Sequence, residues 1–193
     1  MASDRRVEKV RVVLRRRQPD LTVVIENVHD PHNVSAILRS CDAVGVMEVQ
    51  LVYTDEEFPK LGKKSSASAK KWVGNRKFKS VKDCFAKLRK EGFAVYATRL
   101  TQQSASLYEL DLTKKTALVF GNEHRGVSEE AAKLADGNFQ IPMHGMIQSL
   151  NVSVACAVSV FEALRQRTAS GDYDAPKFST RKLNALIKEW TLK

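Results

Sequence analysis

The stretch that decides the fold is IPMHGMIQSLNVSVACAVSVFEALRQR, residues 141–167. It joins the end of a short strand to a glycine loop and then to an unusually apolar helix, predicted over 149–167. Ser149 is the predicted N-cap, because a serine hydroxyl can accept a hydrogen bond from a first-turn N–H group. Apolar residues then recur every three or four positions, which predicts one helical face packed in the core. These residues are Leu150, Val154, Ala157, Phe161 and Leu164.

Ser149 and Asn151 lie beside the loop 143–148, at the end of the helix where backbone N–H groups lack an intrahelical partner. The positive end of a helix can hold a ligand carboxylate or hydroxyl. An ordinary capped helix would account for the same residues, so the choice depends on the rest of the chain.

Two further segments place polar residues directly after apolar strands. The first, ENVHDPHNVSAILRSC (26–41), follows the apolar run 21–25 and carries Asn33 and Arg39. Six residues are just under two helical turns, so these two side chains lie on roughly adjacent faces. The second, ALVFGNEHRGVSEE (117–130), is predicted to be a buried strand ending in a glycine loop that carries Glu123.

In this order, the three segments resemble the three motifs of the SpoU/TrmH family of RNA 2′-O-ribose methyltransferases, in the SPOUT superfamily. The matching residues are Asn33 and Arg39 in the first motif, Gly121 and Glu123 in the second, and Ser149, Leu150 and Asn151 in the third. Ser35 departs from the pattern, since many members carry glycine there, and this bears on how tight that loop is. The resemblance spans nearly the whole chain and implies an α/β fold whose C-terminal part forms a deep trefoil knot.

The resemblance also implies that S-adenosylmethionine binds in the knotted loops. The residues it carries over for the cofactor are Thr98, Gly121, Ile141, Met143, Ser149, Leu150 and Asn151. These positions are strand ends and loops, and ligands of open parallel sheets bind at the carboxyl ends of the strands. His29 and His32 are three residues apart, but no carboxylate or thiol set completes a metal site, so no metal is predicted.

Methyl transfer to a ribose 2′-hydroxyl needs the hydroxyl proton to be removed as the oxygen attacks. The resemblance makes Arg39 the proposed base. An arginine pKa above about 12 makes that role demanding, and phosphate binding is the alternative. Glu123 is chemically an easier base, and its loop also suits orientation of Asn33, Arg39 or the substrate. Asn33 is expected to position Arg39 or the ribose, with an ordinary N-cap after Pro31 and His32 as the alternative.

The rest of the chain alternates strands and helices, which predicts a largely parallel sheet covered on both faces. The predicted strands are 21–28, 46–53, 93–98, 116–120 and 138–141, and the predicted helices besides 149–167 are 3–17, 33–44, 80–91, 128–135 and 179–192. Residues 54–75 lack a clear period and are predicted to be a mobile loop. The expected domains are a basic N-terminal helical extension (1–19), the methyltransferase domain (20–168) and a C-terminal helical extension (169–193).

Glycine spacing argues against common nucleotide folds. No G-x-G-x-x-G follows the first strand. Gly121 and Gly126 have the spacing of a phosphate loop, but Val127 and Ser128 follow where that loop has lysine and serine or threonine. An NTPase or NAD enzyme is therefore disfavoured.

The bulk composition bounds the class of protein. A chain of 193 residues, 43% of them hydrophobic, is expected to form about one domain with a good-sized core. No apolar run approaches the roughly 18 residues of a membrane span, and the basic N-terminus lacks a signal-peptide core, so a cytoplasmic protein is expected. Cys41, Cys84 and Cys156 are an odd set without a C-x-x-C pair, which favours reduced, buried thiols.

The net charge is +10, and 23 of the 32 Lys and Arg residues fall in three clusters, at 5–17, 60–82 and 165–193. Clustering of one sign favours a polyanion partner over a solvated surface. The residues predicted to bind RNA are Arg11, Arg15, Arg16, Arg17, Lys70, Lys71 and Arg165. Trp72, Phe78, Tyr173 and Trp190 lie among the charges and could stack on bases. For the tryptophans, anchoring the terminal helices to the core is the favoured role.

The flanking segments bear on the substrate. Larger family members carry an additional RNA-binding domain, and the shortest lack flanking helices. This chain has about twenty residues before its first strand and a short helix after the third motif, similar to members that methylate guanosine 18 in the tRNA D-loop. The resemblance therefore implies a tRNA substrate and a homodimer. Another tRNA site, an rRNA site and a catalytically idle RNA-binding relative remain alternatives, and the complete motif set favours the enzyme.

Overall fold

The computed structural model describes residues 3–54, 57–59 and 69–193. Across these residues, seven parallel strands form one sheet in the order β3-β2-β1-β6-β4-β7-β5. The strands are β1 (Leu21–Glu26), β2 (Glu48–Val52), β3 (Gly74–Phe78), β4 (Ala94–Thr98), β5 (Ala105–Ser106), β6 (Thr116–Phe120) and β7 (Gly137–Gln140). β1 and β6 are buried along their whole length in the middle of the sheet, as expected when both faces are covered.

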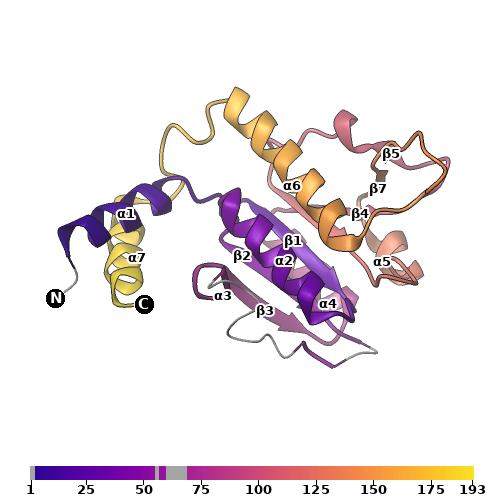
Figure 1. Cartoon of the computed structure of the whole chain (residues 1–193), viewed down its shortest axis with the longest axis horizontal. Coiled ribbons are helices and arrows are strands. Elements are labelled where there is room, and N and C mark those ends of the chain that lie inside the picture. The colour runs from indigo at the N-terminus through magenta and orange to yellow at the C-terminus, as the bar shows by residue number, and fades with distance from the viewer. Residues whose placement is uncertain (1–2, 55–56, 60–68) are drawn as a thin grey trace.

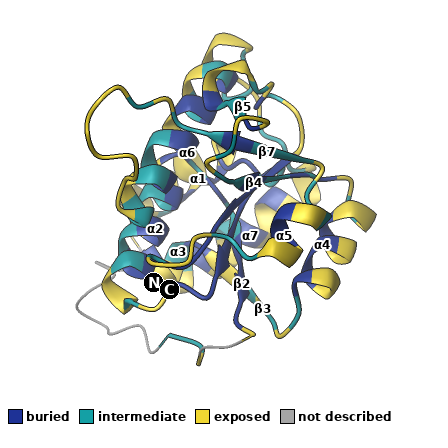
Figure 2. Ribbon diagram, turned by 90° about the vertical axis from the view of Figure 1, so that its right-hand side faces the viewer, coloured by how far each residue is buried: buried dark blue, intermediate teal, exposed yellow. Residues whose placement is uncertain are grey.

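Helices cover both faces of the sheet (Figure 1). One face carries α2 (Pro31–Ala43), α3 (Ala69–Trp72) and α6 (Val152–Ala169), and the other carries α4 (Val81–Lys90) and α5 (Glu129–Leu134). Buried residues are concentrated in the strands and on the inward sides of these helices (Figure 2). The predicted α/β architecture with a parallel sheet is confirmed. Within the described part of the chain, no helix is long and apolar enough to span a membrane.

The predicted loop over 54–75 is wrong in its last part. Residues 69–72 form α3, and β3 begins at Gly74, while residues 55–56 and 60–68 lie outside the described residues. β3 reads GNRKF and is exposed or half-buried throughout. It is an edge strand, and lysines are typical of protected sheet edges, so it lacks the apolar pattern by which a strand is predicted. The short β5 and the 3-10 helix η1 (Leu107–Glu109) also lacked such a pattern.

The N-cap of the helix predicted over 149–167 lies two residues later than predicted. Asn151 is the N-cap of α6, and its Oδ1 atom accepts hydrogen bonds from the N–H groups of Ser153 at 2.8 Å and Val154 at 3.4 Å. The N-cap prediction for Ser149 is therefore wrong.

The predicted core face of α6 is wrong at three of its five residues, while the half-buried Leu164 does pack against the main core. Leu150, Val154 and Phe161 are 40%, 47% and 48% exposed. The residues of α6 that pack inward are Cys156, Ser159, Val160, Ala163 and Arg167. Because α6 is apolar nearly all round, its period could not identify the inward face.

The terminal helices α1 (Asp4–Arg15) and α7 (Thr180–Leu192) pack against each other beside the domain, and the start of α1 lies close to the end of α7 (Figure 1). Their shared apolar core consists of Val10, Leu14, Leu183, Leu186 and Trp190. The rings of Trp190 and Trp72 lie 5.2 Å apart, between centroids. The anchoring role expected for the two tryptophans is confirmed.

Arg17 connects this helix pair to the domain. Its side chain is 1% exposed, with the guanidinium 5.1 Å from the Trp190 ring centroid, and it donates a hydrogen bond to the Val46 carbonyl at 2.8 Å. It also forms an ion pair with Asp42. The RNA contact predicted for Arg17 is wrong, because these groups enclose its charge.

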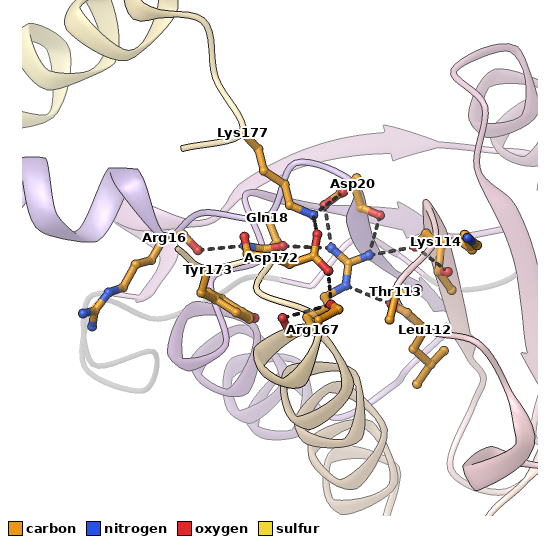
Figure 3. A network of polar contacts seen from close by, with 12 residues as sticks. Arg16, Gln18, Asp20, Leu112, Thr113, Lys114, Arg167, Asp172, Tyr173 and Lys177 are labelled. Atoms are coloured by element: carbon orange, nitrogen blue, oxygen red, sulfur yellow. Dashed lines mark hydrogen bonds and ion pairs between the residues drawn. The ribbon is translucent and has the colours of Figure 1, made fainter. Parts of the chain in front are cut away.

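A second buried arginine, Arg167, ties the end of α6 to the amino ends of β1 and β6 (Figure 3). It donates hydrogen bonds to the side chains of Gln18 and Asp20 at 2.9 and 2.6 Å, and to the carbonyls of Leu112 and Lys114 at 2.9 and 2.8 Å. Lys177 reaches the same Asp20 carboxylate at 2.6 Å and that of Asp172 at 2.7 Å. The segment after α6 is thereby fixed to the start of the sheet.

The cysteines are buried as predicted. Cys41, Cys84 and Cys156 are all free thiols without exposed surface. Burial raises the pKa of the Cys84 thiol to about 12, so this thiol stays protonated and unreactive near neutral pH.

Candidate active site

A pocket of about 490 Å³ opens at the carboxyl ends of β4, β6 and β7. This volume is within the usual range for sites that hold small molecules and cofactors, and the carboxyl edge is where parallel α/β sheets bind ligands. Six of the seven predicted cofactor residues line it, namely Thr98, Gly121, Ile141, Met143, Ser149 and Leu150. Residues separated by more than fifty positions in the sequence thus line a single pocket.

Gly121 is required by the close approach of two backbone segments. The chain turns back after β6, with the Asn122 N–H donating to the Gly126 carbonyl at 3.0 Å and the Gly126 N–H donating to the Asn122 carbonyl at 2.8 Å. A Cβ atom on Gly121 would lie 2.1 Å from the Gly126 carbonyl oxygen, closer than any packing allows. The absent side chain therefore fixes the loop that forms one wall of the pocket.

Glu123 projects from this loop to the start of α2. Its carboxylate accepts hydrogen bonds from the backbone N–H groups of His29 at 3.0 Å and Asp30 at 3.1 Å, and from the Asn33 amide at 2.9 Å. Asn33 in turn accepts a hydrogen bond at 3.1 Å from the Asn151 amide. One residue from each of the three sequence motifs is thus joined in a single chain of hydrogen bonds.

The surroundings of Glu123 determine its charge. Partial burial alone would raise the pKa of this carboxyl, but the hydrogen bonds donated by Asn33 and by the backbone of His29, Glu123 and Asp30 outweigh that effect and lower it. A carboxylate with a lowered pKa and occupied lone pairs is a poor proton acceptor near neutral pH. The geometry therefore favours orientation over base catalysis for Glu123.

Asn33 is not an N-cap, contrary to the alternative considered from the sequence. Asp30 caps α2, with its carboxylate accepting from the His32 N–H at 2.8 Å. The Asn33 side chain is left to bridge Glu123 and Asn151 through its two different ends, a donor amide and an acceptor oxygen.

Arg39 is exposed on α2, six residues beyond Asn33, which is about 9 Å along the helix axis. Among the described residues it has no hydrogen-bond or ion-pair partner. The structure therefore does not bring Arg39 into contact with Glu123 or Asn33, and leaves its guanidinium available to a ligand outside the chain.

The remaining predicted RNA-binding residues lie away from the pocket. Arg11, Arg15 and Arg16 on or just after α1, and Lys70 and Lys71 on α3, are exposed. Arg165 is exposed too but pairs with Glu162 at 2.8 Å. Helices α1 and α3 lead directly into the amino ends of β1 and β3, and Arg165 lies near the end of α6 that contacts the amino end of β6. The structure thus separates these residues from the pocket at the carboxyl edge.

Sequence reasoning missed Asn122, which stands between the two second-motif residues and is 7% exposed. Its Oδ1 atom accepts from the His124 and Arg125 N–H groups at 3.0 and 3.2 Å, and its amide donates to the Asn27 carbonyl at 2.8 Å. Asn27 adopts a left-handed backbone with φ of 47°, a conformation that asparagine tolerates better than most residues. An asparagine inside a glycine loop was the available signal for Asn122.

Within the residues that the structure describes, no group of three or more His, Cys, Asp or Glu side chains is placed to hold a metal ion.

Comparison with known proteins agrees with this geometry. The model of the SpoU rRNA Methylase family matches residues 20–161. A tRNA (guanosine(18)-2′-O)-methyltransferase of Thermus thermophilus is 50% identical over 192 residues, covering 100% of this chain and 97% of the relative. The match therefore includes both terminal helices.

Solved structures extend the comparison. A TrmH/SpoU tRNA modifying enzyme from A. aeolicus superposes with a TM-score of 0.91 at 39% identity, covering 98% of this chain and 96% of that one. An AdoMet-bound rRNA methyltransferase from Sinorhizobium meliloti superposes with a TM-score of 0.65 at 26% identity, covering 80% of this chain and 59% of that one. The likeness to the A. aeolicus structure extends beyond the sheet to the helical extensions.

Proposed function

Because the chain belongs to the SpoU rRNA methylase family, we propose that it transfers a methyl group from S-adenosylmethionine to the ribose 2′-hydroxyl of guanosine 18 in tRNA. The observation that carries the proposal is the convergence of all three motifs, through Asn33, Glu123 and Asn151, beside one pocket at the carboxyl edge. An RNA-binding protein without activity would need only exposed charge, not this chain of oriented side chains.

The pocket fits the proposed cofactor. Apolar walls from Leu100, Ile141 and Leu150 alternate with backbone and polar groups around Gly121 and Gln140, a lining typical of nucleoside-sized ligands. S-adenosylmethionine, when bound, supplies a methyl group on a positively charged sulfur. The likeness to the AdoMet-bound Sinorhizobium meliloti structure supports the assignment.

The chain's own residues then divide the remaining work. Glu123 stays ionised and fixes the Asn33 amide, so that α2 is held in one position against the pocket. Arg39 extends from the same helix into solvent, where its planar guanidinium can bind a phosphate and the oxygen of the reacting hydroxyl. We assign Arg39 to the reacting nucleotide, as base or as phosphate clamp, and Glu123, Asn33 and Asn151 to positioning.

Guanosine 18 of tRNA is proposed from the relatives. The match to the Thermus thermophilus relative that carries this name covers 97% of that relative and 100% of this chain, including α1 and α7. Another tRNA position or an rRNA would use the same chemistry, so the RNA and nucleotide have to be identified directly. A location in the cytoplasm, where tRNA is modified, goes with this proposal.

We further propose a homodimer that buries the exposed stripe on α6. Val154 and Phe161 are exposed on one side of the helix, and Leu150 directly precedes its N-cap. Met146 and Ile147 in the preceding loop are 98% and 75% exposed. Contiguous exposed apolar surface of this kind usually marks an interface. The trefoil knot in the C-terminal part of the domain, and the division into extensions 1–19 and 169–193, are proposed on the same family likeness.

The test is mass mapping of tRNA transcripts after incubation with the purified protein and S-adenosylmethionine. We expect one 2′-O-methylguanosine at position 18, and none in a transcript that carries 2′-deoxyguanosine there. Methylation of a different nucleotide, or of rRNA fragments only, would show that guanosine 18 of tRNA is not the substrate. RNA binding without any methyl transfer would show that the protein is a catalytically idle RNA-binding relative and not an enzyme.

A further inference from the structure

A cluster of two lysines around one aromatic ring lies at the carboxyl end of the edge strand β3. The ammonium groups of Lys77 and Lys79 lie 4.8 and 4.5 Å from the centroid of the Phe58 ring. Lys77 is in β3 and Lys79 directly follows the last residue of that strand, and both ammonium groups reach the same ring. Both are exposed. We call these three residues the β3 cluster.

The β3 cluster concentrates positive charge that the described part of the chain does not neutralise. Among the described residues, no carboxylate forms an ion pair with Lys77 or Lys79, whereas the neighbouring Arg76 on the opposite face is paired with Glu48 and Glu91. Two ammonium groups held against one ring repel each other, and an anion between them would remove that repulsion. The Phe58 ring restricts the positions of both lysines through cation–π attraction.

The β3 cluster belongs to the same edge of the sheet as the pocket. All described strands are parallel, so the carboxyl end of β3 faces the same side as those of β1 and β6. β3 is three strands, or about 14 Å, from β6, the nearest strand whose end lines the pocket. This distance is short enough for one RNA strand to contact both the β3 cluster and the pocket. The basic residues on α1 and α3 lie at the opposite edge.

A direct packing path connects the β3 cluster to the residues around Glu123. Phe58 packs on Tyr53 with ring centroids 5.4 Å apart, and the Tyr53 hydroxyl donates to the Val28 carbonyl at 2.9 Å. Val28 directly precedes His29, whose N–H donates to Glu123. Tyr53 is fully buried. The lysines are therefore held in a fixed place relative to the active site.

From these observations we propose that Lys77 and Lys79, held by Phe58, bind the sugar-phosphate backbone of the substrate RNA beside the reacting nucleotide. The inference rests on the proposed function, because it takes the substrate to be an RNA that reaches the pocket. It gives the central basic cluster a role at the site of reaction, separate from the exposed arginines of α1.

The test compares the double variant Lys77→Ala/Lys79→Ala with a matched control, Lys90→Ala/Lys133→Ala. The control removes two exposed lysines from α4 and α5, on the other face of the sheet. Binding of a tRNA transcript is measured from about 50 to 300 mM salt. We expect the β3 double variant to bind at least about tenfold more weakly at low salt, with a log–log salt slope shallower by about 1.4 to 1.8, or 0.7 to 0.9 per phosphate contact. The slope of the control should stay near that of the wild type.

Two more variants distinguish the contribution of the two lysine charges from that of the Phe58 ring. Lys77→Arg/Lys79→Arg should keep the wild-type slope, because both charges remain. Phe58→Leu keeps an apolar group on Tyr53 but removes the ring face, so we expect weaker binding with an unchanged slope. S-adenosylmethionine affinity and thermal unfolding should stay at wild-type values in the lysine variants, since none of these lysines lines the pocket.

The outcomes separate this inference from the proposed function. Equal salt slopes for the β3 double variant and its control, in a protein that methylates tRNA normally, would overturn the inference and leave the function intact. A wild-type protein that binds no tRNA or transfers no methyl group would overturn the function itself. Wild-type tRNA affinity in Phe58→Leu would show that the Phe58 ring does not contribute to RNA binding by the β3 cluster.

Discussion

Replacing Glu123 by glutamine tests whether this residue orients the site or acts as its base. The substitution keeps the shape of the side chain and removes its charge. One glutamine oxygen can still accept from Asn33 and Asp30, as Oε1 does now, but the new amide group then faces the His29 N–H, which donates to Oε2 at 3.0 Å. The variant therefore loses one charge-assisted hydrogen bond and leaves a donor without an acceptor.

The size of the effect follows from that count. An unsatisfied donor costs about 1 to 3 kcal/mol, and partial exposure of Glu123 allows water to recover some of it, so we expect a loss of about 1 to 2 kcal/mol in the free energy of unfolding. For a chain of this length that is a melting temperature lower by about 2 to 8 °C. Methyl transfer should fall by about ten- to a hundredfold, the scale of a small displacement of the reacting groups.

The pH dependence of the unfolding free energy and of the methyl-transfer rate distinguishes the orienting role from the base role. The pKa of Glu123 is lowered in the folded chain, so its ionised form contributes stability above the ordinary glutamate pKa of about 4.3, and that stability is lost as the pH falls through the lowered value. The difference in unfolding free energy between wild type and Glu123→Gln should therefore be constant from about pH 6 to 9 and shrink below about pH 4. The pH-rate profile of methyl transfer should keep its shape in the variant.

Single-turnover methylation and denaturant unfolding, each followed across pH, measure these quantities. Suppose that the wild-type rate falls with an apparent pKa between about 6 and 7, that Glu123→Gln abolishes this dependence, and that its stability is unchanged. The residue would then be the base, and the orienting role would be refuted.

Three further predictions follow from the same geometry. Arg39→Ala should lower the single-turnover methylation rate by at least about a hundredfold while S-adenosylmethionine affinity stays nearly constant. Arg39→Lys should not restore the rate, because a point charge cannot replace the planar guanidinium. A normal methylation rate with weaker tRNA binding would show that Arg39 acts only as a phosphate clamp. Gly121→Ala should abolish cofactor binding in calorimetry, since its Cβ would lie 2.1 Å from a carbonyl oxygen, whereas Gly145→Ala, with open space around it, should bind normally. Phe161→Asp should lower the mass measured by light scattering to that of a monomer. The control Val12→Asp, at a similarly exposed apolar residue on α1, should not change that mass. An unchanged mass for Phe161→Asp would show that the interface lies elsewhere.

The sequence predicted the parts of the fold whose signal is local. Alternating apolar strands and capped helices identified β1, β2, β4, β6 and β7 and most of the helices, because buried parallel strands are continuous apolar runs. β3 escaped detection because an edge strand rich in lysine has no such run. The inward face of α6 also escaped it, because a periodic pattern identifies an apolar face without saying what covers that face.

The candidate site could be predicted as a set of residues but not as a geometry. Six residues named from the family resemblance line one pocket. The hydrogen bonds that Asn33 donates to Glu123 and Asn151 donates to Asn33 depend on how three distant loops meet. The lowered pKa of Glu123 is a consequence of that meeting. It changes which residue can act as a base, and no spacing in the sequence contains it.

Charge is where sequence and structure differ most. The composition counts every Lys and Arg alike, and on that count Arg17 and Arg167 belong to clusters expected to bind RNA. The structure buries both, Arg17 under Trp190 and Arg167 among carbonyls and Asp20. Burying a guanidinium is costly where its donors lack partners. Arg167 satisfies its donors, whereas Arg17 is paired through its two terminal nitrogens and its buried Nε has no partner. Both join the terminal segments to the amino edge of the sheet. The positive charge available to RNA is therefore smaller than the net charge suggests. At the carboxyl edge it includes the two lysines of the β3 cluster, which is why their removal should reduce the salt dependence of tRNA binding more than an equal loss of charge from α4 and α5.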